Sequence, residues 1–204
     1  MKRGIPSELL EMLENNPETV DFVAGYLEAD RDKVGKFSKE EIEAEHPLLL
    51  QWDKRWGYYR YGDSMIAVSG CGTVCLSMVI LGMTHEEVTP AEVARFSERE
   101  GYYVEGSGTS WKLMTEGAEH FGLVGTEISL SERVMKTCLD DGGMIICAMR
   151  PGDFTTEGHF IVVYGYDGDA FHVNDPNSRE RSSRSWSFDR LSPQIKNLWA
   201  YSVS

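Results

Sequence analysis

The chain has 204 residues, of which 41% are hydrophobic and 26% charged, and its net charge at neutral pH is −13. This length fits one domain with a small appendage. The anionic surface disfavours nucleic acid and anionic membranes as partners. The longest apolar stretch, residues 74–83, is too short to span a bilayer. The first residues turn amphipathic and acidic after Lys2 and Arg3, unlike a signal peptide.

The N-terminal quarter of the chain predicts two short helices and a connector. Ser7 is a candidate N-cap for the first helix, and Pro17 suits the first turn of the second. The charged residues 30–45 predict a connector, and the aromatic, glycine-punctuated residues 47–62 predict irregular chain against a core. We therefore expect residues 1–45 to form a helical appendage and residues 46–204 the main domain.

Helix signals then give way to strand signals. Helices are predicted over 72–81, 90–100, 110–121 and 131–141, with Thr89 and Ser131 as N-caps. Short strands follow at 144–149 and on both sides of Asp167-Gly168-Asp169, a hairpin signal, and a last strand closes the chain. Helices followed by antiparallel strands predict an α+β fold with two packed layers.

Cys71 lies between Gly70 and Gly72, directly before an apolar helix. The unpaired N–H groups and dipole of a helix N-terminus favour an anion there, which here is the thiolate. Flanking glycines allow a tight turn and a close approach of a substrate carbonyl, and the Cys71 N–H is placed to stabilise an oxyanion. The other cysteines, Cys75, Cys138 and Cys147, show no paired spacing, so neither a disulfide framework nor a zinc site is predicted.

A thiol nucleophile needs a base, and His159 is the best placed of five histidines. It follows Gly158 and opens an apolar strand beside a loop. If Gly168 centres the hairpin turn, Asp175 shares a face with His159; a two-residue turn at Gly168-Asp169 puts Asn174 there instead. Either side chain can orient an imidazole. Gln51 is a candidate second donor for an oxyanion.

The order of these residues, with the wording around them, resembles papain-fold cysteine peptidases of the bacteriocin-processing endopeptidase group (peptidase family C39-like). The matching pieces include LLQWDKRWG, SGCGTVCLSMVILG and GHFIVVYGYDGDAFHVNDPN. The resemblance implies a papain-like fold whose nucleophile helix packs on a C-terminal antiparallel sheet. It also implies Cys71 as nucleophile, His159 as base, Asp175 as orienting residue and Gln51 in the oxyanion hole. Relatives with such an N-terminal helical piece are often exported, so we expect an extracellular or cell-surface location.

These observations predict a cysteine peptidase that acts on a peptide or protein substrate without a metal or organic cofactor. Trp52, Gly70 and Gly158 are expected to contact that substrate. Two alternatives stay open: acyl transfer to an amine or cleavage of cell-wall peptides by the same nucleophile, and a non-catalytic domain that binds peptide or glycan. In the last case the aromatic residues of 52–61 would line a groove (Trp52, Trp56, Tyr58, Tyr59 and Tyr61).

Overall fold

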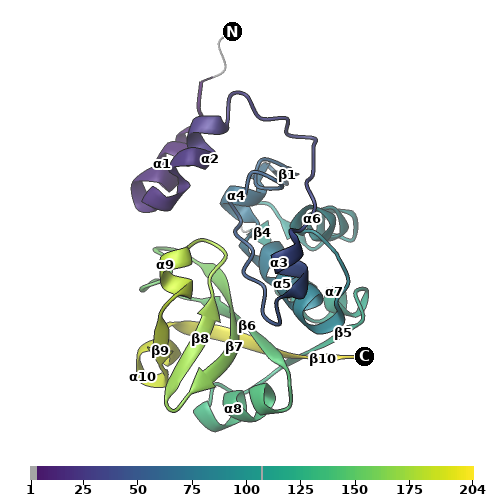
Figure 1. Ribbon diagram of the computed structural model, residues 1–204, viewed down its shortest axis with the longest axis vertical. Helices are drawn as coiled ribbons and strands as arrows, with labels where there is room; N and C mark the ends of the chain where they lie inside the picture. Colours follow the sequence, from purple (N-terminus) through teal and green to yellow (C-terminus); the bar gives the residue numbers. More distant parts are fainter. Residues whose placement is uncertain (1–3, 107) are drawn as a thin grey trace.

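The fold is described by a computed structural model of residues 4–106 and 108–204. Figure 1 shows three parts: the N-terminal helices in purple, a group of helices in blue to teal, and a sheet in green to yellow with its own flanking helices. Within the described residues, every helix falls short of the length and apolarity that a membrane span requires.

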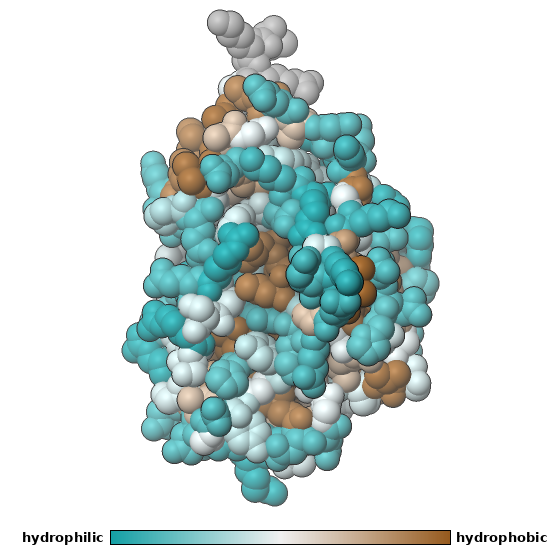
Figure 2. Space-filling model, in the orientation of Figure 1, coloured by the Kyte–Doolittle hydropathy of each residue, from teal (hydrophilic) through white to brown (hydrophobic). Residues whose placement is uncertain are grey.

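The N-terminal helical unit consists of α1 (Ser7–Asn15), η1 (Pro17–Thr19) and α2 (Val20–Gly25). Pro17 opens η1 as predicted, and the Asn16 side chain accepts a hydrogen bond from the Glu18 N–H. Ser7 is not the N-cap of α1, because Pro6 takes that position and leaves the helix without a side-chain cap. The unit is held by a hydrophobic cluster shared with the main domain (Leu9, Phe22, Val23, Tyr26, Leu50, Trp52, Tyr58, Met65 and Ala67). Figure 2 shows the surface of this unit at the top of the molecule, where brown apolar side chains gather beside teal polar ones.

The charged connector contains a helix that its sequence did not lead us to expect. It is α3 (Lys39–Glu43), which begins with a capping box in which Ser38 and Glu41 bond each other's backbone N–H groups. The Glu41 carboxylate also pairs with the Arg55 guanidinium at 2.7 Å. The connector is therefore tied to the main domain.

The central helix of the main domain is α5 (Cys71–Thr84), and it is buried over most of its length. Shorter elements surround it: two small hairpins and four further helices, which are β1 (Arg60–Tyr61), β2 (Ser64–Met65), α4 (Ile66–Ser69), α6 (Pro90–Arg99), β3 (Tyr103–Val104), β4 (Gly108–Thr109), η2 (Trp111–Met114) and α7 (Glu116–Glu119). Thr89 caps α6 as predicted. The predicted helix over 110–121 is broken at Thr115, where the backbone leaves the helical region.

Six antiparallel strands form one sheet in the order β5-β10-β6-β7-β8-β9. Their bounds are β5 (Leu123–Glu127), β6 (Met144–Met149), β7 (His159–Asp167), β8 (Ala170–Asn174), β9 (Ser185–Ser187) and β10 (Ile195–Val203). The edge strands β5 and β9 were not predicted. The remaining helices are α8 (Glu132–Asp140), α9 (Arg179–Ser182), α10 (Phe188–Leu191) and η3 (Ser192–Gln194). Ser131 stands at the N-cap of α8 but makes no side-chain cap bond.

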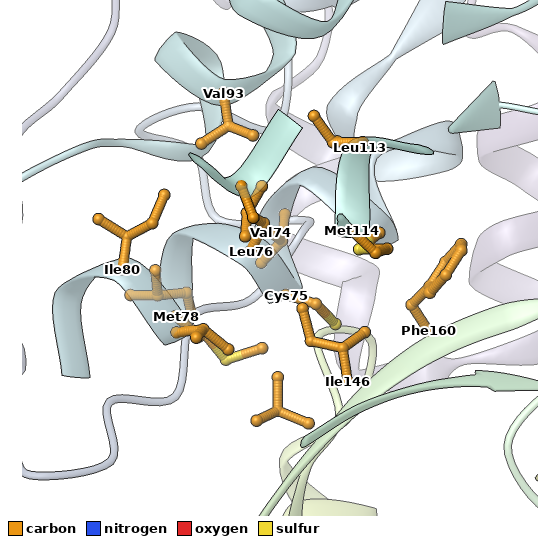
Figure 3. Packing of buried hydrophobic residues seen from close by; sticks show 14 of the residues in the cluster. Val74, Cys75, Leu76, Met78, Ile80, Val93, Leu113, Met114, Ile146 and Phe160 are labelled. Atoms are coloured by element: carbon orange, nitrogen blue, oxygen red, sulfur yellow. The ribbon is translucent and has the colours of Figure 1, made fainter. Parts of the chain in front are cut away.

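The sheet separates two cores because successive side chains of a strand point to opposite faces. In β6, Ile146 and Ala148 face the core around α5, whereas Ile145 and Cys147 face the core that α8 covers. Figure 3 shows Cys75 of α5 beside Ile146, with side chains of α6 and η2 on the other side of the helix. This packing fixes the N-terminus of α5 against the sheet.

Candidate active site

Cys71 is the first residue of α5, and a break at Gly70 separates it from α4. The Gly70 N–H donates to the Ile66 carbonyl and the Val74 N–H to the Gly70 carbonyl. Because the helical run is interrupted between them, the Cys71 N–H belongs to the first turn of α5, where amide groups lack an intrahelical acceptor. The half-buried thiol therefore lies at the positive end of the helix dipole, next to the backbone N–H of its own residue.

Gln51 is buried beside this helix end, and its Nε2 donates to the Ala67 carbonyl at 2.6 Å. An amide nitrogen carries two hydrogens, so one remains for another acceptor. The backbone N–H of Gln51 donates to the Pro176 carbonyl at 2.7 Å, which ties this residue to the segment after β8. Gln51, Cys71 and His159 line one cavity together.

His159 is the first residue of β7, and its Nε2 lies 2.7 Å from Oδ1 of Asp175. Cys71 acts on the same ring, since it is among the groups that raise the pKa of His159. Because Nε2 is taken by Asp175, Nδ1 is the ring nitrogen left for the thiol. Both His159 and Asp175 are buried. The structure thus brings together Cys71, His159 and Asp175, the residues predicted as nucleophile, base and orienting carboxylate, from a helix end, a strand start and a strand end.

The register of the hairpin combines both alternatives considered for it. Asp167 pairs with Ala170 across a two-residue turn at Gly168-Asp169, which is the second alternative. A bulge between Val163 and Gly165 then shifts the register by one residue. Beyond the bulge, Val162 pairs with Asn174, and the pairing of the first alternative is restored. Asn174 faces away from the histidine and donates to the carbonyls of His46 and Pro47.

Asp175 is fully buried and receives three further constraints that the sequence did not indicate. Arg181 of α9 donates from Nε to Oδ2 at 2.5 Å, and the Asn177 N–H donates to Oδ1 at 2.8 Å. The Asp175 N–H donates to Ser182 Oγ. No sequence motif marks Arg181. Its contact with Asp175, six residues earlier in the chain, exists because the chain turns tightly after β8.

Electrostatics favour charged forms in this cluster. Burial opposes the charge on His159, but the Asp175 carboxylate and the Cys71 thiolate outweigh it and raise the histidine's pKa to about 10. Burial also opposes ionisation of Asp175, but His159 and Arg181 outweigh it and lower the pKa of the carboxyl below its usual value. The arrangement therefore favours the protonated form of His159 between Asp175 and Cys71.

The three residues expected to contact substrate differ in their surroundings. Gly158 lines the cavities on both sides of Cys71. Trp52 is 7% exposed and donates from Nε1 to the Asn177 carbonyl, so it holds the Asp175 segment rather than facing the cleft. At Gly70 a Cβ would meet the Ile66 carbonyl oxygen at 2.7 Å, so this glycine permits the junction of α4 and α5. Neither Trp52 nor Gly70 is among the described residues that line the cleft.

The cleft has two lobes that meet at Cys71 and His159. The first lobe, about 430 Å³, is lined by Gln51, by the 152–158 loop and by residues of α1. The second lobe, about 690 Å³, is lined by apolar and aromatic side chains such as Trp111, Met149 and Phe160. Cys71, Gly158 and His159 line both lobes.

The remaining cysteines and the aromatic segment are parts of the core. Cys75 and Cys147 are fully buried, and burial raises the pKa of both thiols. Four of the five aromatic residues in 52–61 are buried as well, and the fifth, Tyr59, is half-buried. These side chains therefore do not form the open groove that the binding-domain alternative requires.

Comparison with known proteins places this geometry in a family. The model of the Peptidase_C39 like family matches residues 43–203. No curated protein sequence matches the chain. The peptidase domain of Streptococcus ComA, a bi-functional ABC transporter involved in a quorum-sensing pathway, is 18% identical, with a TM-score of 0.53 over 78% of this chain and 98% of its own. A Bacillus anthracis chain described as C39-like peptidase is 13% identical, with a TM-score of 0.51 over 78% of this chain and 95% of its own. These likenesses concern the fold, which is α+β and papain-like.

Proposed function

The chain belongs to the Peptidase_C39 like family, and from that premise we propose that it is a cysteine peptidase with a Cys71-His159-Asp175 triad. The observation that supports this most is the chain of contacts from Cys71 to His159 to Asp175 at the N-terminus of α5. We assign catalysis to residues 46–204, with residues 1–45 as an appendage.

In the proposed reaction the Cys71 thiolate attacks the substrate carbonyl carbon and forms a carbon–sulfur bond. The Cys71 N–H and the second Nε2 hydrogen of Gln51 donate to the oxyanion. The imidazolium of His159 gives its proton to the leaving amine as the carbon–nitrogen bond breaks. His159 then removes a proton from water, and the resulting hydroxide releases the acyl group as a carboxylic acid. Asp175 holds the ring in position throughout.

Mapping of thiol reactivity tests this proposal and requires no substrate. Iodoacetamide at mildly acidic pH should alkylate Cys71 in the native protein, because only an ion-paired thiol is appreciably ionised there. Cys138, which is half-buried and whose pKa is raised by burial, is the internal control. The proposal would be contradicted if neither Cys71 nor Cys138 were labelled in the native protein and both were labelled equally after denaturation.

Hydrolysis of a peptide library provides the second test. Cys71→Ala should abolish cleavage and Cys138→Ala should not. Products formed with and without an added amine then separate hydrolysis from acyl transfer by the same nucleophile, since only transfer incorporates the amine. Wild-type cleavage that persists in Cys71→Ala would exclude this thiol as the nucleophile.

A further inference from the structure

The N-terminal helical unit reaches the cleft, although it lies outside the part of the chain that the family model matches. Residues of α1 and its C-terminal end line the first lobe of the cleft together with Gln51, Cys71 and His159 (Glu8, Glu11, Met12, Asn15 and Asn16). Figure 1 shows α1 and α2 at the upper left of the view, above α9 and to the left of α4. One wall of the candidate active site is thus made by the appendage.

Polar contacts fix this wall on both sides of the cleft. Glu8 accepts a hydrogen bond from Ser64 Oγ at 3.0 Å on the β2 side. On the α9 side, Asn16 Nδ2 donates to the Asn177 carbonyl, and Glu18 accepts from Ser178 Oγ. Because Asn177 also donates to Asp175, the appendage and the triad share one loop. The wall is a built part of the site rather than a tethered tail.

The first lobe carries uncompensated negative charge. Glu8 and Glu11 of α1 and Glu157 of the loop line it, and no lysine or arginine of the described residues forms an ion pair with them. Asp153, which also lines the lobe, is neutralised by Arg190. Arg181 is the one lysine or arginine among the described lining residues. Its Nε donates to Asp175, whereas its buried Nη2 has no partner among the described residues.

Gln51 adds an independent sign that a donor is missing in this lobe. Its side chain is 5% exposed, and Oε1 has no hydrogen-bond partner among the described residues. A buried acceptor without a partner costs free energy, so such an atom is normally met by a ligand or water. An unmet amide oxygen, together with carboxylates that have no ion-pair partner among the described residues, complements a group that donates N–H bonds and carries positive charge.

We propose that the N-terminal helical unit is a fixed wall of the substrate cleft and that this lobe receives a cationic nitrogen of the substrate, such as a lysine or arginine side chain. This inference rests on the proposed function, because it assigns the charge of the substrate at that same site. The second lobe has apolar side chains in its lining together with the charged side chains of Asp63, Glu157 and Lys196.

Charged thiol reagents measure the electrostatic potential of the first lobe directly at Cys71. A thiolate displaces methanesulfinate from an alkyl methanethiosulfonate and forms a mixed disulfide. The rate ratio of the 2-aminoethyl reagent, a cation, to the 2-sulfonatoethyl reagent, an anion, reports the local potential and cancels the intrinsic reactivity of the thiol. The measurement uses the full chain with Cys138→Ser, so that labelling of the other half-buried thiol is removed.

We expect a ratio above that of a small free thiol, and we expect Glu8→Gln with Glu11→Gln to lower it about threefold at low ionic strength. Glutamine keeps an acceptor for Ser64, so the wall stays in place. Glu14→Gln, on the same helix but away from the lobe, is the matched control and should keep the wild-type ratio.

The outcomes separate the two proposals. An unchanged ratio in the double variant, with Cys71 still reactive, would overturn this inference and leave the proposed function standing. Cys71 that reacts with neither reagent in the native protein would overturn both. A ratio lowered equally by Glu14→Gln would also overturn the inference, since the effect would then be a general one of net charge.

Discussion

The Ala67 carbonyl lies 2.6 Å from Nε2 of Gln51 and stands four residues before Cys71. In an uninterrupted helix this carbonyl would accept the Cys71 N–H. Here the Gln51 side chain occupies it, and Gly70 ends α4. The Gln51 side chain thus satisfies the carbonyl that the break at Gly70 separates from the Cys71 N–H, and Gln51 and Cys71 line the same lobe of the cleft.

Replacement of Gln51 tests its role as a donor. We expect Gln51→Ala to lower kcat/KM roughly 100-fold, as loss of one oxyanion donor does in other acyl-transfer enzymes. The rate of iodoacetamide alkylation of Cys71 should stay close to that of the wild type, because alkylation forms no oxyanion. A parallel loss of both rates would assign Gln51 a purely structural role.

The pH dependence of peptide hydrolysis reports the charge on His159. Since the pKa of His159 is raised from 6.5 to about 10, kcat/KM should hold through neutral pH and fall as the pH rises through about 10. The same shift has a consequence for folding: stability from the charged ring is fully present below about pH 6.5 and is lost as the pH rises through about 10.

Asp175→Asn tests whether the carboxylate of Asp175 sets the pH dependence of kcat/KM. Without the carboxylate, burial dominates and lowers the pKa of His159, so the alkaline limb should move towards neutral pH while kcat falls. Measurement of kcat/KM across the neutral and alkaline range for both proteins checks the shift. An alkaline limb at the same pH in wild type and Asp175→Asn would show that the carboxylate does not set the charge of the ring.

Arg181 is expected to act as a positioning residue through Asp175. Removal of its cation in Arg181→Gln raises the pKa of the Asp175 carboxyl, so the acid limb of kcat/KM should move to higher pH. We also expect kcat/KM to fall roughly tenfold, because a hydrogen bond to a charged group contributes about 1.5 kcal/mol. Arg181→Lys should restore part of the loss because it keeps the charge.

Arg184→Gln, a nearby arginine that makes no contact with Asp175, is the control for Arg181. Its pH profile should match that of the wild type. If Arg181→Gln lowers the melting temperature without any change in the pH profile, the arginine is structural and does not tune the triad.

The comparison of sequence and structure shows which features local patterns encode. Thr89, Pro90 and the apolar period of α6 were sufficient to locate that helix, because capping and periodicity act within a few residues. The capping box of Ser38 and Glu41 was present in the sequence, but the high charge of the segment concealed the helix, and the long-range ion pair of Glu41 with Arg55 could not be read from a local pattern. Ser7 failed as a cap because Pro6, one residue earlier, takes that position.

The parts of the candidate site that could not be predicted depend on long-range geometry. The bulge after Val163 decides whether Asp175 or Asn174 faces His159, and no local pattern marks it. The partnership of Arg181 with Asp175 depends on a turn between them. The wall made by α1 depends on contacts across more than 150 residues, such as that of Asn16 with Asn177.

Two glycines of the site provide a last test, because they were expected to play the same role and their surroundings differ. A Cβ at Gly70 would lie 2.7 Å from the Ile66 carbonyl oxygen and 2.8 Å from its Cα, whereas a Cβ at Gly158 has nothing within 4 Å. We expect Gly70→Ala to destabilise the protein by about 1–3 kcal/mol, because the backbone of α4 must shift. Gly158→Ala should change stability by less than about 0.5 kcal/mol. Urea unfolding of both variants measures the difference, and equal stability of the two variants would contradict the packing role assigned to Gly70.

Because any shift at Gly70 also moves the Cys71 N–H, Gly70→Ala should lower kcat even where the protein remains folded.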